Sequence, residues 1–137
     1  MTKIGSRRKL AQKSMKRKQI KLYPLDLVFS KVIKIEVVYT CEYCGKKGVQ
    51  LHCHHGVVGR RYRNTRYEKD NCAVVCVGCH WFLGDFPQIN TAFFLKRIGS
   101  DRMEQLQIIA RSGHKPDLEL IKSELTEKLK RLGNESD

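Results

Sequence analysis

Two Cys-x-x-Cys pairs constrain the fold of this chain more than any other feature: Cys41 with Cys44, and Cys76 with Cys79. Two such turns can place four thiolates at the corners of a tetrahedron, which is the geometry that a structural Zn²⁺ takes. We therefore expect these four cysteines to bind a structural zinc ion that holds a small domain together. The gap between the pairs is longer than in a plain zinc ribbon, so we expect the inserted residues to carry the function.

The size and charge of the chain limit its organisation and its partners. Its 137 residues allow one domain with a small core plus tails, and we expect a basic flexible arm over residues 1–22 and a domain over residues 23–137. The net charge of +13 predicts a polyanionic partner, with nucleic acid ahead of an anionic membrane surface. The arm is basic throughout, and we expect it to contact phosphates through residues that include Arg7, Arg8 and Lys9. A solvated tail that only helps solubility is the alternative.

The apolar runs and the cysteines indicate the compartment. No apolar run approaches the roughly 20 residues that span a bilayer, and no secretory signal follows the basic start. Because four of the six cysteines form metal-ligand pairs, we expect a cytoplasmic protein in a reducing compartment and no disulfide framework. We expect Cys53 and Cys72 to be small buried side chains. Replacement of one zinc ligand by Cys53 is the alternative.

The residues before the first cysteine pair predict a helix and then an extended segment. Apolar residues from Leu25 to Ile33 recur at helical spacing. The β-branched run that follows, Ile35–Tyr39, predicts an extended approach to Cys41. Both segments are expected to pack in the core.

The residues between the pairs predict a strand, a loop, a second strand and a helix. The strands are expected over residues 49–55 and 72–75, and the helix is expected to start near Gly78. We expect the basic side chains of the loop to grip a nucleic-acid backbone, although they could instead form a solvated surface. These side chains are Arg60, Arg61, Arg63, Arg66 and Lys69.

The core of the domain is expected over residues 41–84, and a helical part over residues 85–133. The helical part predicts three helices, over residues 88–98, about residues 101–111, and from Pro116 onward. The last helix carries one apolar stripe. We expect that stripe to pack on the core of its own domain, and the seam of a homodimer is the alternative.

Four motifs occur in a fixed order along this region: Cys-x-x-Cys-Gly, the pair His54-His55, Asn71, and Cys-x-x-Cys-His. In this order, and with this pair of zinc knuckles, the sequence resembles the HNH endonuclease superfamily, most of all the phage NinG/Rap recombination-nuclease family. The resemblance covers about residues 25–110 and includes a later Ile-Gly at Gly99. It implies an α+β fold, with a small ββα-metal core stapled by a four-cysteine zinc site and flanked by helices. It also implies a phage-encoded, metal-dependent DNA endonuclease that acts on branched or single-strand-containing DNA.

The resemblance implies a role for each residue of this constellation. His55 is the general base, and Asn71 orients it or supports the turn behind it. His54 and His80 bind one divalent cation at an open site. An imidazole titrates near neutrality, which suits proton transfer from water. Two imidazoles suit Zn²⁺, Ni²⁺ or Mn²⁺ better than Mg²⁺, and the sequence leaves the identity of the cation undecided.

One position departs from the family pattern. Most HNH enzymes carry an acidic residue immediately before the catalytic histidine, where this chain has His54. In an ideal strand His52 and His54 share a face and His55 points away, so His54 and His55 converge only if the strand ends or bulges, which Gly56 permits. We assign no role to His52 or His114. A non-catalytic zinc-ribbon nucleic-acid-binding protein is the alternative function.

Overall fold

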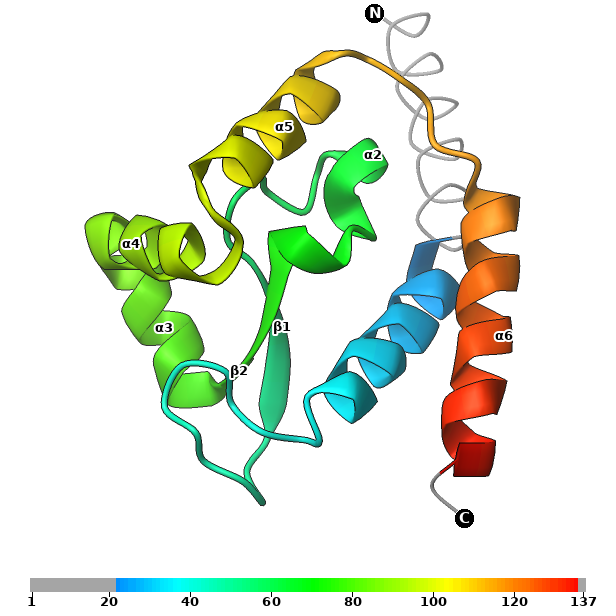
Figure 1. The fold of residues 1–137 in the computed structure, drawn as a ribbon, viewed down its shortest axis with the longest axis horizontal. Coiled ribbons are helices and arrows are strands. Elements are labelled where there is room, and N and C mark those ends of the chain that lie inside the picture. The colour runs from blue at the N-terminus through cyan, green and yellow to red at the C-terminus, as the bar shows by residue number, and fades with distance from the viewer. Residues whose placement is uncertain (1–21, 136–137) are drawn as a thin grey trace, which may run out of the picture.

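The computed structural model describes residues 22–135, and almost all of the expected arm, with Arg7, Arg8 and Lys9, lies outside this range. At the centre of the described chain is a two-stranded antiparallel sheet of β1 (Leu51–His55) and β2 (Cys72–Cys76) (Figure 1). Helix α3 (Val77–Asp85) follows β2 directly. The predicted order of strand, loop, strand and helix is confirmed, as is the α+β class.

Three longer helices follow, at the places where the sequence predicts them: α4 (Pro87–Ile98), α5 (Ser100–Arg111) and α6 (Leu118–Glu135). The inserted loop contains two short elements that the sequence did not predict, α2 (Arg63–Arg66) and the 3-10 turn η1 (Lys69–Asn71). None of the helices in the described part of the chain is long and apolar enough to cross a membrane.

The extended segment predicted before Cys41 is wrong. Residues 22–36 are helical, and a turn over residues 37–39 leads to the first cysteine pair. Ile33 belongs to the hydrophobic cluster of buried residues around the sheet, which is the main core of the domain. Val37, four residues later, packs against this core, so the helical spacing continues into the β-branched run. Packing on the core outweighs the intrinsic β preference of these side chains.

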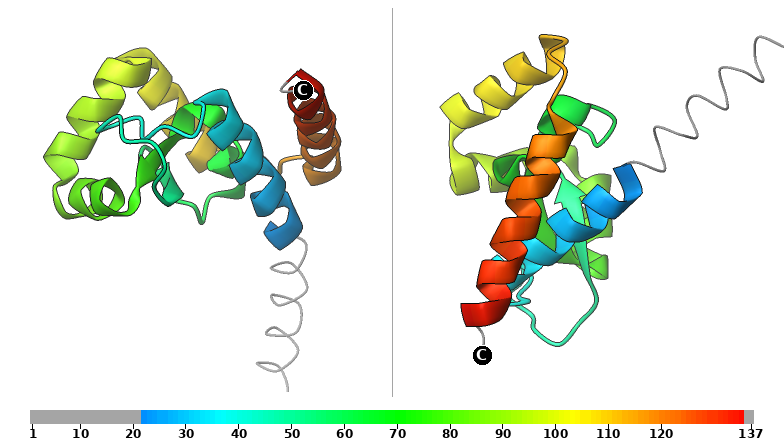
Figure 2. Two further views of the ribbon diagram at one scale, coloured as in Figure 1. Left: turned by 90° about the horizontal axis from the view of Figure 1, so that it is seen from below. Right: turned by 90° about the vertical axis from the view of Figure 1, so that its right-hand side faces the viewer.

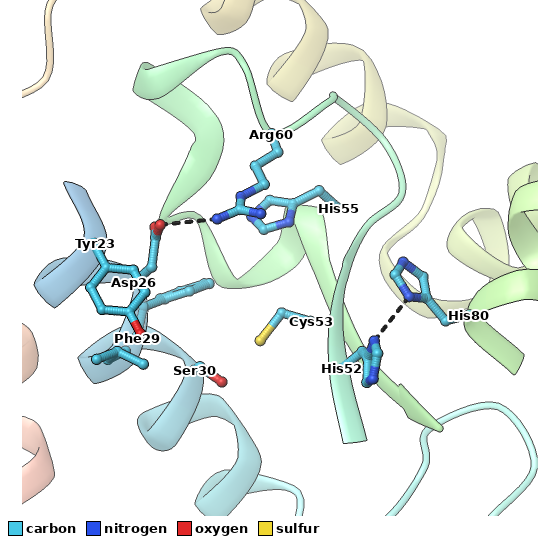
Figure 3. A pocket seen from close by; sticks show the side chains of 10 residues that line it. Tyr23, Asp26, Phe29, Ser30, His52, Cys53, His55, Arg60 and His80 are labelled. Carbon is cyan, nitrogen blue, oxygen red and sulfur yellow. Dashed lines mark hydrogen bonds and ion pairs between the residues drawn. The ribbon is translucent and has the colours of Figure 1, made fainter. Parts of the chain in front are cut away.

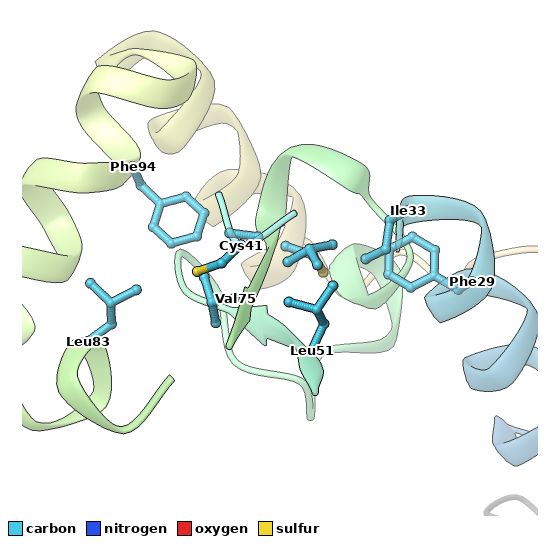
Figure 4. Packing of buried hydrophobic residues seen from close by; sticks show 10 residues of the cluster. Phe29, Ile33, Cys41, Leu51, Val75, Leu83 and Phe94 are labelled. Atoms are coloured by element: carbon cyan, nitrogen blue, oxygen red, sulfur yellow. The ribbon is translucent and has the colours of Figure 1, made fainter. Parts of the chain in front are cut away.

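Both faces of the sheet are covered. Phe29 and Ile33 from the helix over residues 22–36 lie on one side, and Leu83 of α3 and Phe94 of α4 lie on the other (Figure 4). This arrangement explains why β2 is buried at four consecutive positions instead of alternating.

The two outer edges of the sheet differ. On β2, the backbone N–H of Glu42 donates to the carbonyl of Val74 at 2.8 Å, so the first cysteine knuckle covers that edge. The outer edge of β1 pairs with no strand in the described part of the chain. The open approach to the sheet is therefore along β1.

Helix α6 lies beside the helix over residues 22–36 (Figures 1 and 2). Leu125 packs against the main core, and Lys128 Nζ lies 3.2 Å from a carboxylate oxygen of Glu36. This part of the apolar stripe therefore packs on its own domain, as expected.

Candidate active site and metal centre

The four cysteines of the two pairs meet in space. Their Sγ atoms all lie within 4.8 Å of one another, and Cys44 Sγ is 3.8 Å from Cys76 Sγ. Zn–S bonds of about 2.3 Å to a tetrahedral ion place the sulfurs about 3.8 Å apart. The quartet therefore has the spacing of a four-cysteine metal site and fits a metal ion such as zinc.

The cysteines of the quartet differ in how readily they ionise. Burial raises the pKa of Cys41, but the backbone N–H groups of Cys44 and Cys76 donate to its Sγ at 3.4 Å and 3.3 Å, and the pKa falls to about 6. Burial and the neighbouring sulfurs raise the pKa of Cys79. Ionisation of one thiol thus hinders ionisation of its neighbours. A divalent cation bound by the quartet would remove this repulsion, because it would stabilise all four thiolates together.

The other two cysteines do not join the quartet. Cys72 is buried in the main core, and Cys53 packs against it. Burial raises the pKa of both thiols. The prediction of a small buried side chain is confirmed for Cys72, whereas Cys53 is only partly buried and also lines a pocket.

The histidines of β1 divide between the two faces of the strand. Pairing is regular as far as His55, which lies opposite Cys72, so no bulge turns His54 and His55 toward each other. The ring centroid of His54 lies 5.2 Å from that of His80 in α3. His52, on the same face of the strand, lies 5.3 Å from His80 by the same measure. The strand does end at His55, but His54 and His55 still point to opposite faces and do not converge.

Asn90 of α4 determines which nitrogen of His54 carries the proton. The Nδ2 of Asn90 donates to the carbonyl of Gly56 at 2.9 Å, so its Oδ1 faces His54 Nε2, at 2.7 Å. An amide oxygen only accepts, so Nε2 carries the proton and Nδ1 keeps its lone pair. Metal-binding histidines are commonly held in this way through their other nitrogen. His54, with 8% of its surface exposed, thus fits the role of a cation ligand.

The carbonyl of Arg66 sets the tautomer of His55 in the same way. It lies 3.0 Å from His55 Nε2, which must therefore donate, and Nδ1 is the basic nitrogen. Burial lowers the pKa of His55, the hydrogen bond to Arg66 opposes this, and the charges of Arg60 and Arg66 lower the pKa further. The ring is therefore neutral near pH 7 and can accept a proton through Nδ1.

Asn71 holds the inserted loop, and the hydrogen bonds of its side chain go to Val58 and Thr65 and not to His55. Its side chain is fully buried; Oδ1 accepts from the N–H of Val58 at 2.6 Å, and Nδ2 donates to the carbonyls of Val58 at 2.9 Å and Thr65 at 3.2 Å. Thr65 directly precedes Arg66, whose carbonyl holds His55. Of the two roles expected for Asn71, its contacts match support of the turn.

A pocket of about 330 Å³ lies at the open edge of β1 (Figure 3). His52 and His80 line it from one face of the strand, and His55 lines it from the other. Cys53, Arg60 and the helix over residues 22–36 complete its wall. The pocket therefore places a basic imidazole, two further imidazoles and a guanidinium around one space.

The basic side chains of the inserted loop differ in availability. Four of them are exposed: Arg60, Arg61, Arg63 and Lys69. Two of these four are also paired with acids, Arg60 with Asp26 at 3.1 Å and Lys69 with Glu36 at 2.8 Å. The side chain of Arg66 is only 12% exposed, and its Nε donates to Asp26 at 2.9 Å. We expected Arg66 to be available on the surface of the loop, but Asp26 holds its guanidinium inside the domain.

Two residues of the site were missed by reasoning from sequence. Asn90 lies in a helix beyond the four motifs, and His52 stands outside the motif order, so only their positions in space connect them to His54 and His80.

The comparisons with known proteins add one finding. No curated protein and no solved structure matches this chain. The comparison with models of protein families gives one match, to a family as a whole. That match does not distinguish between the branches of the family, so it does not test the resemblance to the NinG/Rap branch. Residues 41–85, which contain both cysteine pairs, both strands and α3, match the family model described as HNH endonuclease, and this match supports assignment of the segment to the HNH superfamily.

Proposed function

We propose that this protein is a metal-dependent DNA endonuclease that hydrolyses phosphodiester bonds. The observation that carries the proposal is His55: its Nε2 is fixed on the carbonyl of Arg66, and the ring lines a pocket that His80 also lines. The match of residues 41–85 to the HNH endonuclease model supports the same activity.

Hydrolysis requires a base for the attacking water and charge stabilisation at the phosphate. In the proposal, Nδ1 of His55 accepts the proton from water, and the carbonyl of Arg66 stabilises the imidazolium that forms through its bond to Nε2. The exposed guanidinium of Arg60 stands in the same pocket and can hold non-bridging phosphate oxygens. Asn71 acts at one remove, because it positions the loop that carries the carbonyl of Arg66.

The proposal assigns His54 and His80 to one divalent cation, as the resemblance implies. The lone pair on Nδ1 of His54 is consistent with this role. Such a cation stabilises charge on the phosphate and the leaving oxygen. Mg²⁺, Mn²⁺, Ni²⁺ and Zn²⁺ all remain candidates, and imidazole ligands favour the last three. Zinc in the cysteine quartet has a structural role in this scheme.

We also propose the wider setting from the resemblance to the NinG/Rap family. The substrate would be branched or single-strand-containing DNA in phage recombination, in the cytoplasm of a host cell. Arg7, Arg8 and Lys9 of the arm, with the exposed basic side chains of the loop, would contact the DNA backbone. A homodimer would suit paired cuts.

A nuclease assay with a matched variant tests the activity. Zinc-loaded protein is incubated with plasmid, single-stranded, flap and four-way-junction DNA, each with Mg²⁺, Mn²⁺, Ni²⁺ or Zn²⁺. We expect cation-dependent cutting by the wild type, and its loss in His55→Ala with DNA binding nearly unchanged. Equal cutting by His55→Ala would reject His55 as the base. Tight DNA binding with no cutting under any cation would favour the zinc-ribbon alternative.

A further inference from the structure

His52, to which the sequence pattern assigns no role, contacts His80 directly. The two Nδ1 atoms are 3.3 Å apart, and the pair is seen across the pocket edge in Figure 3. A single hydrogen bond between two imidazoles would account for this separation. The same separation also matches a shared cation, because Zn–N bonds of about 2.0–2.1 Å place two tetrahedral ligand nitrogens about 3.3 Å apart.

The position of the pair favours the cation. His52 and His80 both line the pocket that His55 lines, whereas His54 is nearly buried and is not part of the pocket wall. A cation that acts on a phosphate beside His55 must be reachable from this pocket. A ligand set of His54 and His80 alone would face the substrate through His80 only.

Helix α3 offers no further ligand beside His80. The residues three and four positions later, which share its side of the helix, are Leu83 and Gly84, and neither has a metal-binding side chain. Strand β1, which packs against this helix, does offer imidazoles. His52 and His54 lie on the same face of that strand, two residues apart, and both rings lie against His80.

Building on the proposed nuclease function, we propose that His52 is a ligand of the divalent cation. His52 and His80 would bind it through Nδ1 on the pocket side, where these two atoms already lie together. The nitrogens of His54 do not form a cluster with both of them in the described structure, so the ring of His54 would have to move closer to join as the third ligand. This ligand set consists of three imidazoles and leaves the remaining positions to water and phosphate, as an open catalytic site requires.

Calorimetric titration of the zinc-loaded protein with Ni²⁺, in the absence of DNA, tests the ligand set. We expect His52→Ala to weaken Ni²⁺ binding by about tenfold or more, since loss of even an outer partner of a ligand costs this much. His52→Phe should weaken binding as strongly, because it keeps a ring against His80 but offers no nitrogen. His114→Ala is the matched control, since His114 is exposed on the connection between α5 and α6. The Ni²⁺ affinity of this variant should equal that of the wild type.

The outcomes separate this inference from the function on which it rests. Wild-type Ni²⁺ affinity in His52→Ala, or affinity retained in His52→Phe, would overturn the role of His52 and leave ring packing as its explanation. Zinc content and far-ultraviolet circular dichroism confirm that each variant is folded. Failure of the wild type to cut DNA would instead count against the nuclease, whatever the Ni²⁺ titrations of the His52 variants show.

Discussion

Replacement of Asn71 by alanine tests whether one buried amide holds the inserted loop in place. The change would leave the N–H of Val58 and the carbonyls of Val58 and Thr65 without this partner in the interior. A buried polar group left unpaired costs about 1–3 kcal/mol, with carbonyls at the lower end because each can accept twice. The carbonyl of Thr65 still accepts from the N–H of Glu68 at 3.2 Å, so the N–H and carbonyl of Val58 carry most of the cost, and we expect a loss of about 2–4 kcal/mol. A typical domain has a free energy of unfolding of only about 5–15 kcal/mol.

Urea unfolding of the zinc-loaded protein, followed by circular dichroism, measures this loss. The midpoint should fall in Asn71→Ala with an unchanged denaturant slope, which shows that stability and not compactness has changed. Asn64→Ala is the matched control. The Nδ2 of Asn64 donates to two carbonyls, those of Ile109 at 2.7 Å and His114 at 3.2 Å, but its surroundings are more exposed, so we expect a loss of about 1 kcal/mol. The reasoning is refuted if Asn71→Ala loses less than about 1 kcal/mol, or no more than Asn64→Ala.

Three further predictions concern packing, metal and acid stability. In Gly56→Ala the new Cβ would overlap the ring of Phe94, so the free energy of unfolding, measured by urea titration, should fall by about 1–3 kcal/mol. Gly84 has open space around it, so Gly84→Ala should have little effect. Equal effects of the two substitutions would contradict this account. Cys41→Ser should lose its zinc by elemental analysis and unfold by circular dichroism, since metal binding and folding are coupled, and a folded, zinc-loaded variant would exclude the structural role. Burial raises the pKa of Asp26, but its arginine and tyrosine partners outweigh this and lower the pKa. The stabilising effect of the carboxylate is therefore complete above about pH 5, and it is lost as the pH falls through the unfolded pKa of about 3.9 and then the lower folded pKa. The stability of the wild type relative to Asp26→Asn should therefore shrink between about pH 5 and about pH 3, and a constant difference would show that the carboxylate contributes nothing.

The parts of the fold that follow from local patterns were predictable from the sequence. The two Cys-x-x-Cys turns determine the quartet, because the chemistry of four thiolates leaves few other arrangements. The two strands and the helices after them follow from apolar periodicity and from turn residues, and their predicted bounds lie within a few residues of the observed ones.

The parts that depend on packing between distant segments were not predictable. The helix over residues 22–36 extends into a β-branched run because Ile33 and Val37 face the same core. The sequence predicts that Arg66 lies on the surface, yet its guanidinium binds Asp26, forty positions earlier, inside the domain. The bond between Asn90 and His54 likewise depends on how α4 docks over the end of β1, which no local pattern records.

The pocket wall has a consequence for how DNA would be retained. Tyr23 and Leu27, in the helix over residues 22–36, line the pocket. The basic residues 1–21 immediately precede this helix in the sequence. A DNA strand held by that basic segment would be tethered to the wall of the pocket itself. Its phosphates would then meet His55 at a local concentration set by the length of the tether and not by the amount of DNA in solution. Shortening or lengthening the chain between the basic residues and Tyr23 would change how far from its anchoring point the strand is cut.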